Sequence, residues 1–156
     1  MIKLYTDGAA SGNPGPGGYG AILRYNAHEK ELAEGFRLTT NNRMELLAVI
    51  RGLQALKKAG MPVTVYSDSS YVVNAIEKGW LANWQKIAFK GKKNVDLWKE
   101  LIPLLKLHKV KFVWVKGHAG HPENERCDQL AVDAAKWPDL KVDFGYEQEN
   151  KPTGLF

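Results

Sequence analysis

Apolar and polar residues alternate with a period of two over much of residues 2–38, and this alternation is typical of strands. It predicts three strands, at 2–7, 19–25 and 31–38. The first is expected to end at Asp7, because Gly8 follows it as a turn signal before a glycine- and proline-rich segment. Three strands in succession without a helix between them imply an antiparallel meander.

From residue 42 the period changes to 3.6, which predicts a helix over 42–59 that is stopped by Gly60 and Pro62. The later elements expected in chain order are a strand at 63–67, short helices at 69–78 and 81–87, a longer helix at 95–107, a strand at 110–115 and a last helix from Pro122. Residues 138–156 are expected to be an irregular tail. This order predicts a single α/β domain over 1–156, with a mixed sheet covered by helices.

The amino-acid composition indicates in which cellular compartment the protein is expected and which classes of protein it does not resemble. One cysteine, Cys127, excludes an internal disulfide and suits a reducing environment. No apolar stretch approaches the roughly 20 residues that a bilayer span needs, and the amino end lacks a signal-peptide pattern. We therefore expect a cytoplasmic protein with no membrane partner and no obligate protein partner. We also expect a monomer, because no large apolar stripe is left over once the helices pack.

Charge is concentrated in the middle of the chain. Residues 78–116 hold ten Lys and Arg against two Asp and Glu, although the whole chain carries only +5. This segment mixes aromatic and basic residues, which are Trp80, Trp84, Phe89, Trp98, Lys86, Lys90, Lys92 and Lys93. Such a surface can neutralise phosphates and stack on bases, which favours nucleic-acid binding. The alternative is a solvated lysine-rich helix pair whose tryptophans fill the core.

Four acidic residues are candidates for a metal site. Asp7 and Asp68 are expected at the ends of neighbouring strands, where ligands gather in open α/β sheets. Glu45 falls in the first turn of a helix, and Asp128 follows the apolar Cys127 on the last helix. Singly, each has an ordinary explanation as a turn, capping or surface residue. Together they would repel one another unless a cation joined them, and oxygen ligands favour Mg²⁺ or Mn²⁺. A carboxylate metal site beside a basic surface predicts a nuclease.

Two other motifs carry no such chemistry. Gly15 to Gly20 match G-x-G-x-x-G, but they lead into a predicted strand, whereas a dinucleotide-binding loop opens a helix. Cys127 lies on the apolar stripe of the last helix, where a thiol is usually inert packing rather than a nucleophile.

Several segments of the chain closely resemble bacterial type 1 ribonuclease H. They are Tyr5-Thr-Asp-Gly8, Gly12 to Gly20, Thr39-Thr-Asn-Asn-Arg-Met-Glu-Leu46, Ser67-Asp-Ser69 and Val115 to Asp128. The resemblance spans roughly residues 2–137 in the same order. It implies the ribonuclease H-like fold, with a five-stranded mixed sheet whose first three strands are antiparallel. It also implies hydrolysis of the RNA strand of RNA/DNA hybrids, with 5′-phosphate and 3′-hydroxyl products and little sequence preference.

The resemblance also implies roles for particular residues. Asp7 is expected to bridge two Mg²⁺ ions, for which Mn²⁺ is a possible substitute, with Glu45, Asp68 and Asp128 as the other ligands. His118 matches a histidine that assists proton transfer or product release. The residues expected to contact the hybrid are Asn13, Thr40, Asn41, Asn42, Ser70, Trp80, Trp84, Lys86, Lys90, Lys92 and Lys93. Asn42 is equally suited to capping a helix, and Ser70 stands where the family usually has a longer glutamine.

Two other functions remain open at this stage. A non-catalytic module of the same fold could bind RNA/DNA hybrids without cutting them, although binding alone does not need four clustered acids. A nuclease of the same fold could act on DNA junctions, although it would have no need of Asn13, Asn41 and Asn42 to read a 2′-hydroxyl. The cellular roles that the resemblance implies are the removal of RNA primers and the clearance of R-loops.

Overall fold

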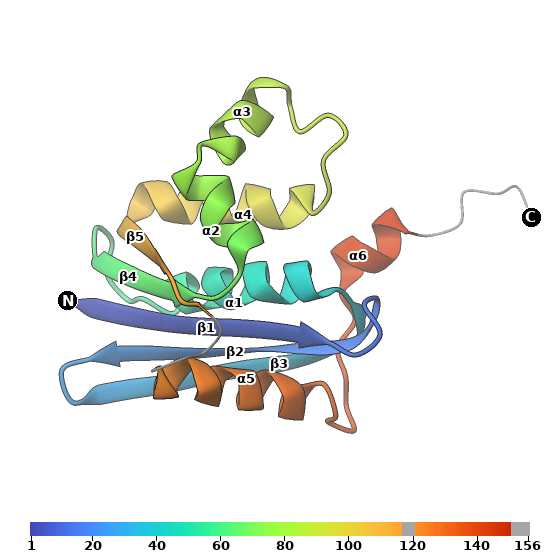
Figure 1. The fold of residues 1–156 in the computed structure, drawn as a ribbon, viewed down its shortest axis with the longest axis horizontal. Helices are drawn as coiled ribbons and strands as arrows, with labels where there is room; N and C mark the ends of the chain where they lie inside the picture. Colours follow the sequence, from blue (N-terminus) through green and yellow to red (C-terminus); the bar gives the residue numbers. More distant parts are fainter. Residues whose placement is uncertain (117–120, 151–156) are drawn as a thin grey trace, which may run out of the picture.

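A five-stranded mixed sheet forms the centre of the protein, seen in a computed structural model that describes residues 1–116 and 121–150 (Figure 1). The strands are β1 (Ile2–Ala10), β2 (Gly15–Tyr25), β3 (His28–Thr39), β4 (Pro62–Ser67) and β5 (Lys109–Trp114). β1, β2 and β3 pair in antiparallel fashion, whereas β4 pairs parallel to β1 and β5 parallel to β4. The sheet order is therefore β3-β2-β1-β4-β5, which confirms the predicted α/β class and the antiparallel meander.

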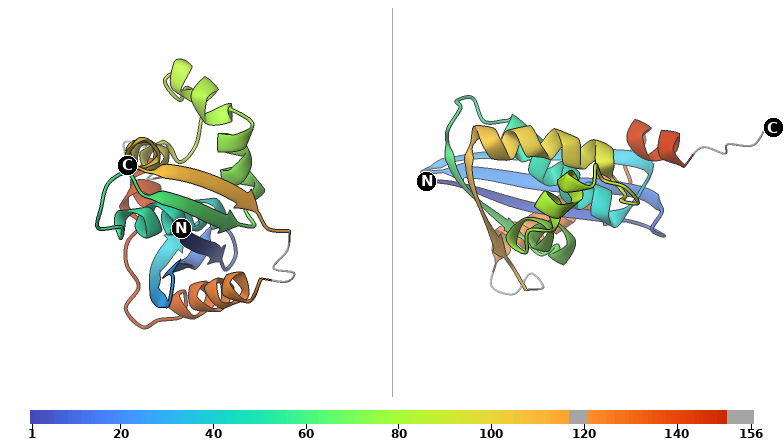
Figure 2. Two further views of the ribbon diagram at one scale, coloured as in Figure 1. Left: turned by 90° about the vertical axis from the view of Figure 1, so that its left-hand side faces the viewer. Right: turned by 90° about the horizontal axis from the view of Figure 1, so that it is seen from above.

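Helices cover both faces of this sheet (Figures 1 and 2). They are α1 (Asn41–Gln54), α2 (Ser70–Glu77), α3 (Trp80–Lys86), α4 (Val95–Leu107), α5 (Pro122–Ala134) and α6 (Phe144–Glu149). α1 and α4 pack on one face and α5 on the other, while α3 stands out beyond these layers (Figure 2). Within the described residues, no helix combines the length and the apolar character that crossing a membrane requires.

The core lies between the sheet and α1. Leu46, Val49, Ile50 and Leu53 of the predicted apolar stripe are all fully buried there. The helix is shorter than the predicted 42–59, since it ends at Gln54. The amide of Ala55 is shared between the carbonyls of Arg51 and Gly52, and that of Leu56 donates to Leu53 three residues back, so the chain tightens into a turn and leaves the helix.

Gly8 and most of the glycines in the segment after it lie inside strands, so the prediction of a turn at Gly8 was wrong, although Gly12 does lie in the turn between β1 and β2. β1 continues past Asp7 to Ala10, and β2 begins already at Gly15. These glycines permit close packing: a Cβ on Gly8 would lie 2.5 Å from the backbone nitrogen of Glu45, and one on Gly18 would lie 2.4 Å from the carbonyl oxygen of Ala131. Because the G-x-G-x-x-G segment is a strand, its rejection as a dinucleotide loop is confirmed.

The segment after α5 is more regular than the predicted irregular tail, at least as far as residue 150. Lys141 forms a parallel bridge to Phe36 at the edge of the sheet, and α6 follows with Asp143 as its N-cap. The side chain of Asp143 is buried and forms an ion pair with Arg43 at 2.7 Å. That contact joins residues 100 positions apart, so no local pattern in the tail predicts it.

Candidate active site

Three of the four predicted carboxylates meet in one cluster. One carboxylate oxygen from each of Asp7, Glu45 and Asp68 lies within 4.8 Å of the others. The cluster lines an open cavity of about 390 Å³, and Asp128 lies on the wall of the same cavity. Other lining residues are Gly8, Asn41, Asn42, Ser69, Ser70 and Tyr71. The structure therefore brings together all four acids that the sequence singled out, three of them closely.

Sheet geometry explains how Asp7 and Asp68 come together. The parallel pairing of β1 with β4 ends at Tyr5 and Tyr66, so the two acids follow directly where these strands part. Asp68 comes immediately after β4, as predicted, and Ser69 rather than Asp68 caps α2 by accepting the amide of Val72 at 3.2 Å. Asp7 does not end its strand, but it lies at the end of the parallel part of the sheet. Asp7 and Asp68 therefore meet as expected, but for Asp7 the relevant boundary is the end of the pairing with β4 and not the end of the strand.

Glu45 reaches the cluster because α1 passes unusually close to β1. Gly8 carries no side chain, and this lets the backbone of Met44 and Glu45 approach the strand. The helix begins at Asn41 with Thr40 as its N-cap, whose hydroxyl accepts the amide of Arg43 at 3.3 Å. Asn42 is therefore inside the helix, and its predicted alternative as the cap was wrong. Glu45 also plays no part in a capping box, which leaves its carboxylate for the cluster.

Burial raises the pKa of two of the carboxylates, Asp7 and Glu45, and the charges of neighbouring acids add to the rise. Burial raises the pKa of Asp7 to about 7, the nearby charges of Asp68 and Asp128 add to the rise, and a hydrogen bond with Glu45 opposes it. Burial and then the charge of Asp7 raise the pKa of Glu45 well above its usual value. Gly8 partly offsets these effects, because its amide donates to Oδ1 of Asp7 at 2.8 Å. The cluster therefore favours protons or a cation over bare negative charge.

The residues present fit a divalent cation. Oε2 of Glu45 is buried and accepts no hydrogen bond from any residue in 1–116 or 121–150. A buried carboxylate oxygen without a donor is costly, whereas a hard cation would satisfy it. All the candidate ligands are oxygens, which suits Mg²⁺ or Mn²⁺ and not a thiolate site for zinc. Asp7, Glu45 and Asp68 are thus the residues that would hold the ion, with Asp128 beside them.

Cys127 and His118 are two further residues considered from the sequence. Cys127 is fully buried and burial raises the pKa of its thiol, which confirms that it is inert packing. His118 lies outside the described residues.

A second cavity adjoins the first and contains several of the predicted substrate contacts. It has a volume of about 310 Å³, and Asn42 lines both cavities. Its remaining lining residues are Asn13, Pro14, Thr40, Lys93, Asn94, Tyr146, Glu149 and Asn150. Asn41 lines the first cavity and contacts the wall of the second. Its backbone amide donates to Oδ1 of Asn13 at 2.9 Å, and its side-chain Oδ1 accepts the backbone amide of Ala10 at 2.5 Å. Amide, hydroxyl and ammonium groups of this kind suit a sugar-phosphate backbone.

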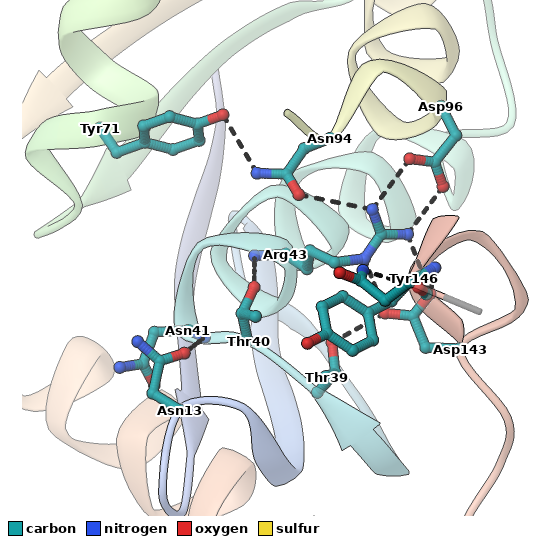
Figure 3. Close-up of polar contacts among 11 residues, drawn as sticks. Asn13, Thr39, Thr40, Asn41, Arg43, Tyr71, Asn94, Asp96, Asp143 and Tyr146 are labelled. Atoms are coloured by element: carbon teal, nitrogen blue, oxygen red, sulfur yellow. Dashed lines mark hydrogen bonds and ion pairs between the residues drawn. The ribbon is translucent and has the colours of Figure 1, made fainter. Parts of the chain in front are cut away.

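Arg43 is the centre of a polar network that reaches Asn94 in the wall of the second cavity (Figure 3). Its guanidinium is buried and donates to Asp143 at 2.7 and 2.9 Å and to Asp96 at 2.7 and 2.8 Å. It also lies 3.5 Å from Oδ1 of Asn94, whose amide nitrogen donates to the hydroxyl of Tyr71 at 3.1 Å. The network thus ties α6, the start of α4 and α2 to the first turn of α1.

The basic segment forms a protrusion made of α3 and the residues after it, up to Lys93 (Figure 1). Trp80 is 38% exposed, and Lys86, Lys90, Lys92 and Lys93 are exposed as well. Trp84 packs against the buried Trp98, with ring centroids 5.6 Å apart. The ammonium group of Lys92 lies over the ring of Trp84, 5.4 Å from its centroid. Trp98 therefore belongs to the core, as the alternative interpretation held, but the lysines remain available to a ligand.

Sequence reasoning missed three residues of this region. Arg43, Tyr71 and Asn94 were assigned no role, yet each links elements around the two cavities. Asn94 carried a usable signal, since an asparagine directly before an apolar helical pattern marks a helix start. It is the N-cap residue of α4, with a φ of 62°. Arg43 and Tyr71 had no local signal, because their partners lie far away in the sequence.

Comparisons with known proteins agree with this geometry. The family described as RNase H matches residues 1–136. A ribonuclease H of Desulforamulus reducens is 61% identical over 91% of this chain and 92% of its own length, and one of Salmonella paratyphi C is 56% identical over 96% and 97%. Among solved structures, LC9 ribonuclease H1, a type 1 enzyme with the type 2 active-site motif, is 31% identical with a TM-score of 0.79, covering 97% of this chain and 81% of that one. LC11 ribonuclease H1 in complex with an RNA/DNA hybrid is 28% identical with a TM-score of 0.60, covering 86% and 96%.

Proposed function

The chain belongs to the ribonuclease H family and is a nuclease of that family, and from this premise we propose that it cuts the RNA strand of RNA/DNA hybrids by hydrolysis that depends on two Mg²⁺ ions. The observation that carries the proposal is the cluster of Asp7, Glu45 and Asp68 within 4.8 Å, beside a cavity lined by polar groups. A neighbour of the same family was solved with an RNA/DNA hybrid, which supports this substrate.

Bound divalent cations would supply Lewis acidity and an activated water for attack on the phosphodiester. Asp7 would be a ligand of the bound cations together with Glu45, Asp68 and Asp128, since its carboxylate interacts with those of all three. The side chains of Asp7 and Glu45 are buried at the base of the cavity. The open cavity leaves room for a phosphate above them. We propose that the cut leaves a 5′-phosphate and a 3′-hydroxyl, and that His118 assists proton transfer or product release.

Recognition follows from the two adjoining cavities and the protrusion. Asn41, Asn42 and Ser70 line the carboxylate cavity, where they face the strand that is cut. Asn13 lines the second cavity and is assigned, with Asn41 and Asn42, to the 2′-hydroxyl in the minor groove. Thr40 and Lys93 line the same cavity, where we assign them to a phosphate of the DNA strand. Further along, Trp80, Trp84, Lys86, Lys90 and Lys92 offer stacking and charge to the same strand. These groups address sugar and phosphate rather than base edges, so little sequence preference is expected.

A substrate panel tests the proposal. Identical sequences are prepared as end-labelled RNA/DNA hybrid, duplex RNA and duplex DNA, and each is incubated with the protein in Mg²⁺, in Mn²⁺ and in chelator. Cleavage of the hybrid's RNA strand alone, and only with metal, is the expected result. Cleavage of duplex DNA would refute the hybrid specificity. Tight hybrid binding without cleavage in either metal would replace the nuclease with a binding module. Such an enzyme would serve in RNA primer removal and R-loop clearance in the cytoplasm, as a monomer.

A further inference from the structure

Asn124 is a buried polar residue that the proposed chemistry does not use. It lies in the first turn of α5, one helical turn before Asp128, and only 1% of it is exposed. It lines neither of the two cavities described above. Burying an amide side chain is costly unless its hydrogen bonds are made inside the protein. Nδ2 of Asn124 makes two hydrogen bonds, whereas its Oδ1 is buried and accepts none from the residues that the structure describes, so the contacts of Nδ2 indicate what the residue does.

Those contacts lie at the place where β1 and β4 separate. Nδ2 of Asn124 donates to the carbonyl oxygen of Thr6 at 3.4 Å and to that of Tyr66 at 3.1 Å. The parallel pairing of the two strands ends at Tyr5 and Tyr66. Beyond it, β1 pairs only with β2 on its other side, and β4 pairs only with β5. The amide of Asn124 thus joins the two strands across the gap with its two N–H groups.

The joined carbonyls belong to the residues that set the carboxylates. Thr6 directly precedes Asp7, and Tyr66 lies two residues before Asp68. The strand separation at this point fixes how far apart the Asp7 and Asp68 side chains begin. Asp128 lies four residues after Asn124 on the same face of α5, so the same anchor also holds that helix to the sheet. Nearby, the thiol of Cys127 adds a contact to the carbonyl of Tyr5 at 3.3 Å.

We propose that Asn124 is a positioning residue for the metal site, which clamps β1 to β4 and α5 to both, so that Asp7, Asp68 and Asp128 are spaced for a divalent cation. The inference rests on the proposed metal-dependent function. A side chain of the same shape that cannot donate hydrogen bonds should loosen this spacing more than a smaller apolar one. Asn124→Asp places a carboxylate oxygen against two carbonyl oxygens, whereas Asn124→Ala only removes the donors.

Metal binding without nucleic acid tests the clamp. Calorimetric titration with Mn²⁺ is expected to show at least tenfold weaker binding for Asn124→Asp than for the wild type, with Asn124→Ala in between. His108→Ala is the matched control, because His108 is also buried and accepts a backbone amide, that of Met61 at 3.3 Å, at the opposite end of β4. The control is expected to bind Mn²⁺ within about twofold of the wild type, although it too loses a buried hydrogen bond.

A merely structural Asn124 would give a different pattern. If the Asn124 variants are folded and bind Mn²⁺ as the wild type does, or if His108→Ala weakens binding equally, the clamp is refuted. Should Asn124→Asp fail to fold, Asn124→Ser keeps one donor and is expected to bind more tightly than Asn124→Ala; equal binding by these two would overturn the inference. Hybrid cleavage is measured separately. A wild type that binds Mn²⁺ but cuts no hybrid would defeat the proposed function and leave the clamp standing.

Discussion

Removing the charge of Asp7 should stabilise the metal-free protein, although it removes a central ligand. The pKa of Asp7 rises from 3.8 to about 7 in the folded state, mainly because of burial. Each pKa unit corresponds to about 1.4 kcal/mol, so the ionised carboxylate costs the fold on the order of 4 kcal/mol. Asp7→Asn removes this cost and keeps an oxygen that can accept the amide of Gly8. We expect the free energy of unfolding to rise by roughly 1–4 kcal/mol at pH 8.

The sign of the pH dependence follows from the same shift. Between about pH 4 and pH 7 the folded protein binds the Asp7 proton more tightly than the unfolded chain does, so the cost grows as pH rises and is complete above pH 7. At pH 5 the cost should be less than half of its value at pH 8, and the advantage of Asp7→Asn should shrink accordingly. Saturating Mg²⁺ should also reduce the advantage, because it stabilises the wild type by binding to the folded state alone.

Urea unfolding followed by circular dichroism measures this effect, in chelator at pH 5 and pH 8 and again with Mg²⁺. Asp139→Asn removes one charge from an exposed loop and serves as the control; it is expected to change stability by less than about 0.5 kcal/mol. If Asp7→Asn is no more stable than the wild type at pH 8 in chelator, the reasoning that the buried, ionised carboxylate of Asp7 destabilises the metal-free fold is refuted.

Three further outcomes are expected. Arg43→Met should lower the free energy of unfolding by about 3–5 kcal/mol in urea, since it leaves Asp143 buried without its cation; a loss under about 1 kcal/mol would contradict the buried ion cluster. Gly18→Ala should destabilise by about 1–3 kcal/mol or more in thermal unfolding, because its Cβ would lie 2.4 Å from a backbone oxygen of α5, and an unchanged melting temperature would refute that close packing. Hybrid affinity should fall steeply with salt, and Lys90→Ala should reduce the salt slope by about one; a slope unaffected by Lys90→Ala would exclude a phosphate contact there.

The local patterns predicted most elements because they report burial, which repeats along the chain. The apolar stripe of α1 and the boundaries of α4 agree with the structure. The alternation predicted for β1 does not continue beyond Lys3, because α1 and α5 cover opposite faces of this strand and residues 4–7 are all buried. The glycine segment was misjudged, since a glycine that lets a helix approach a strand looks the same in sequence as one that permits a turn. Only the folded structure distinguishes the two cases: a Cβ added to Gly18 would lie 2.4 Å from the carbonyl oxygen of Ala131 in α5.

The sequence predicted the acidic residues of the candidate site but not the residues that hold them in place. Each acid has an ordinary explanation when taken singly, but the four together predict a shared site, and the sheet order then brings Asp7 and Asp68 together. Arg43 and Asn124 look ordinary in sequence, because a helical arginine or asparagine is normally solvated. Their importance arises from burial and from partners 100 and 118 residues away, which only the folded chain reveals.

The most direct test of the central claim, that the clustered carboxylates hold divalent metal for cutting RNA/DNA hybrids, is the initial cleavage rate of an end-labelled hybrid as a function of Mg²⁺ concentration. It is measured for the wild type, Asp68→Asn and the control Asp139→Asn. A metal-dependent rate that the control retains and that Asp68→Asn lowers by at least a hundredfold is the predicted result. A rate that persists in chelator, or that Asp68→Asn leaves unchanged, would contradict the claim.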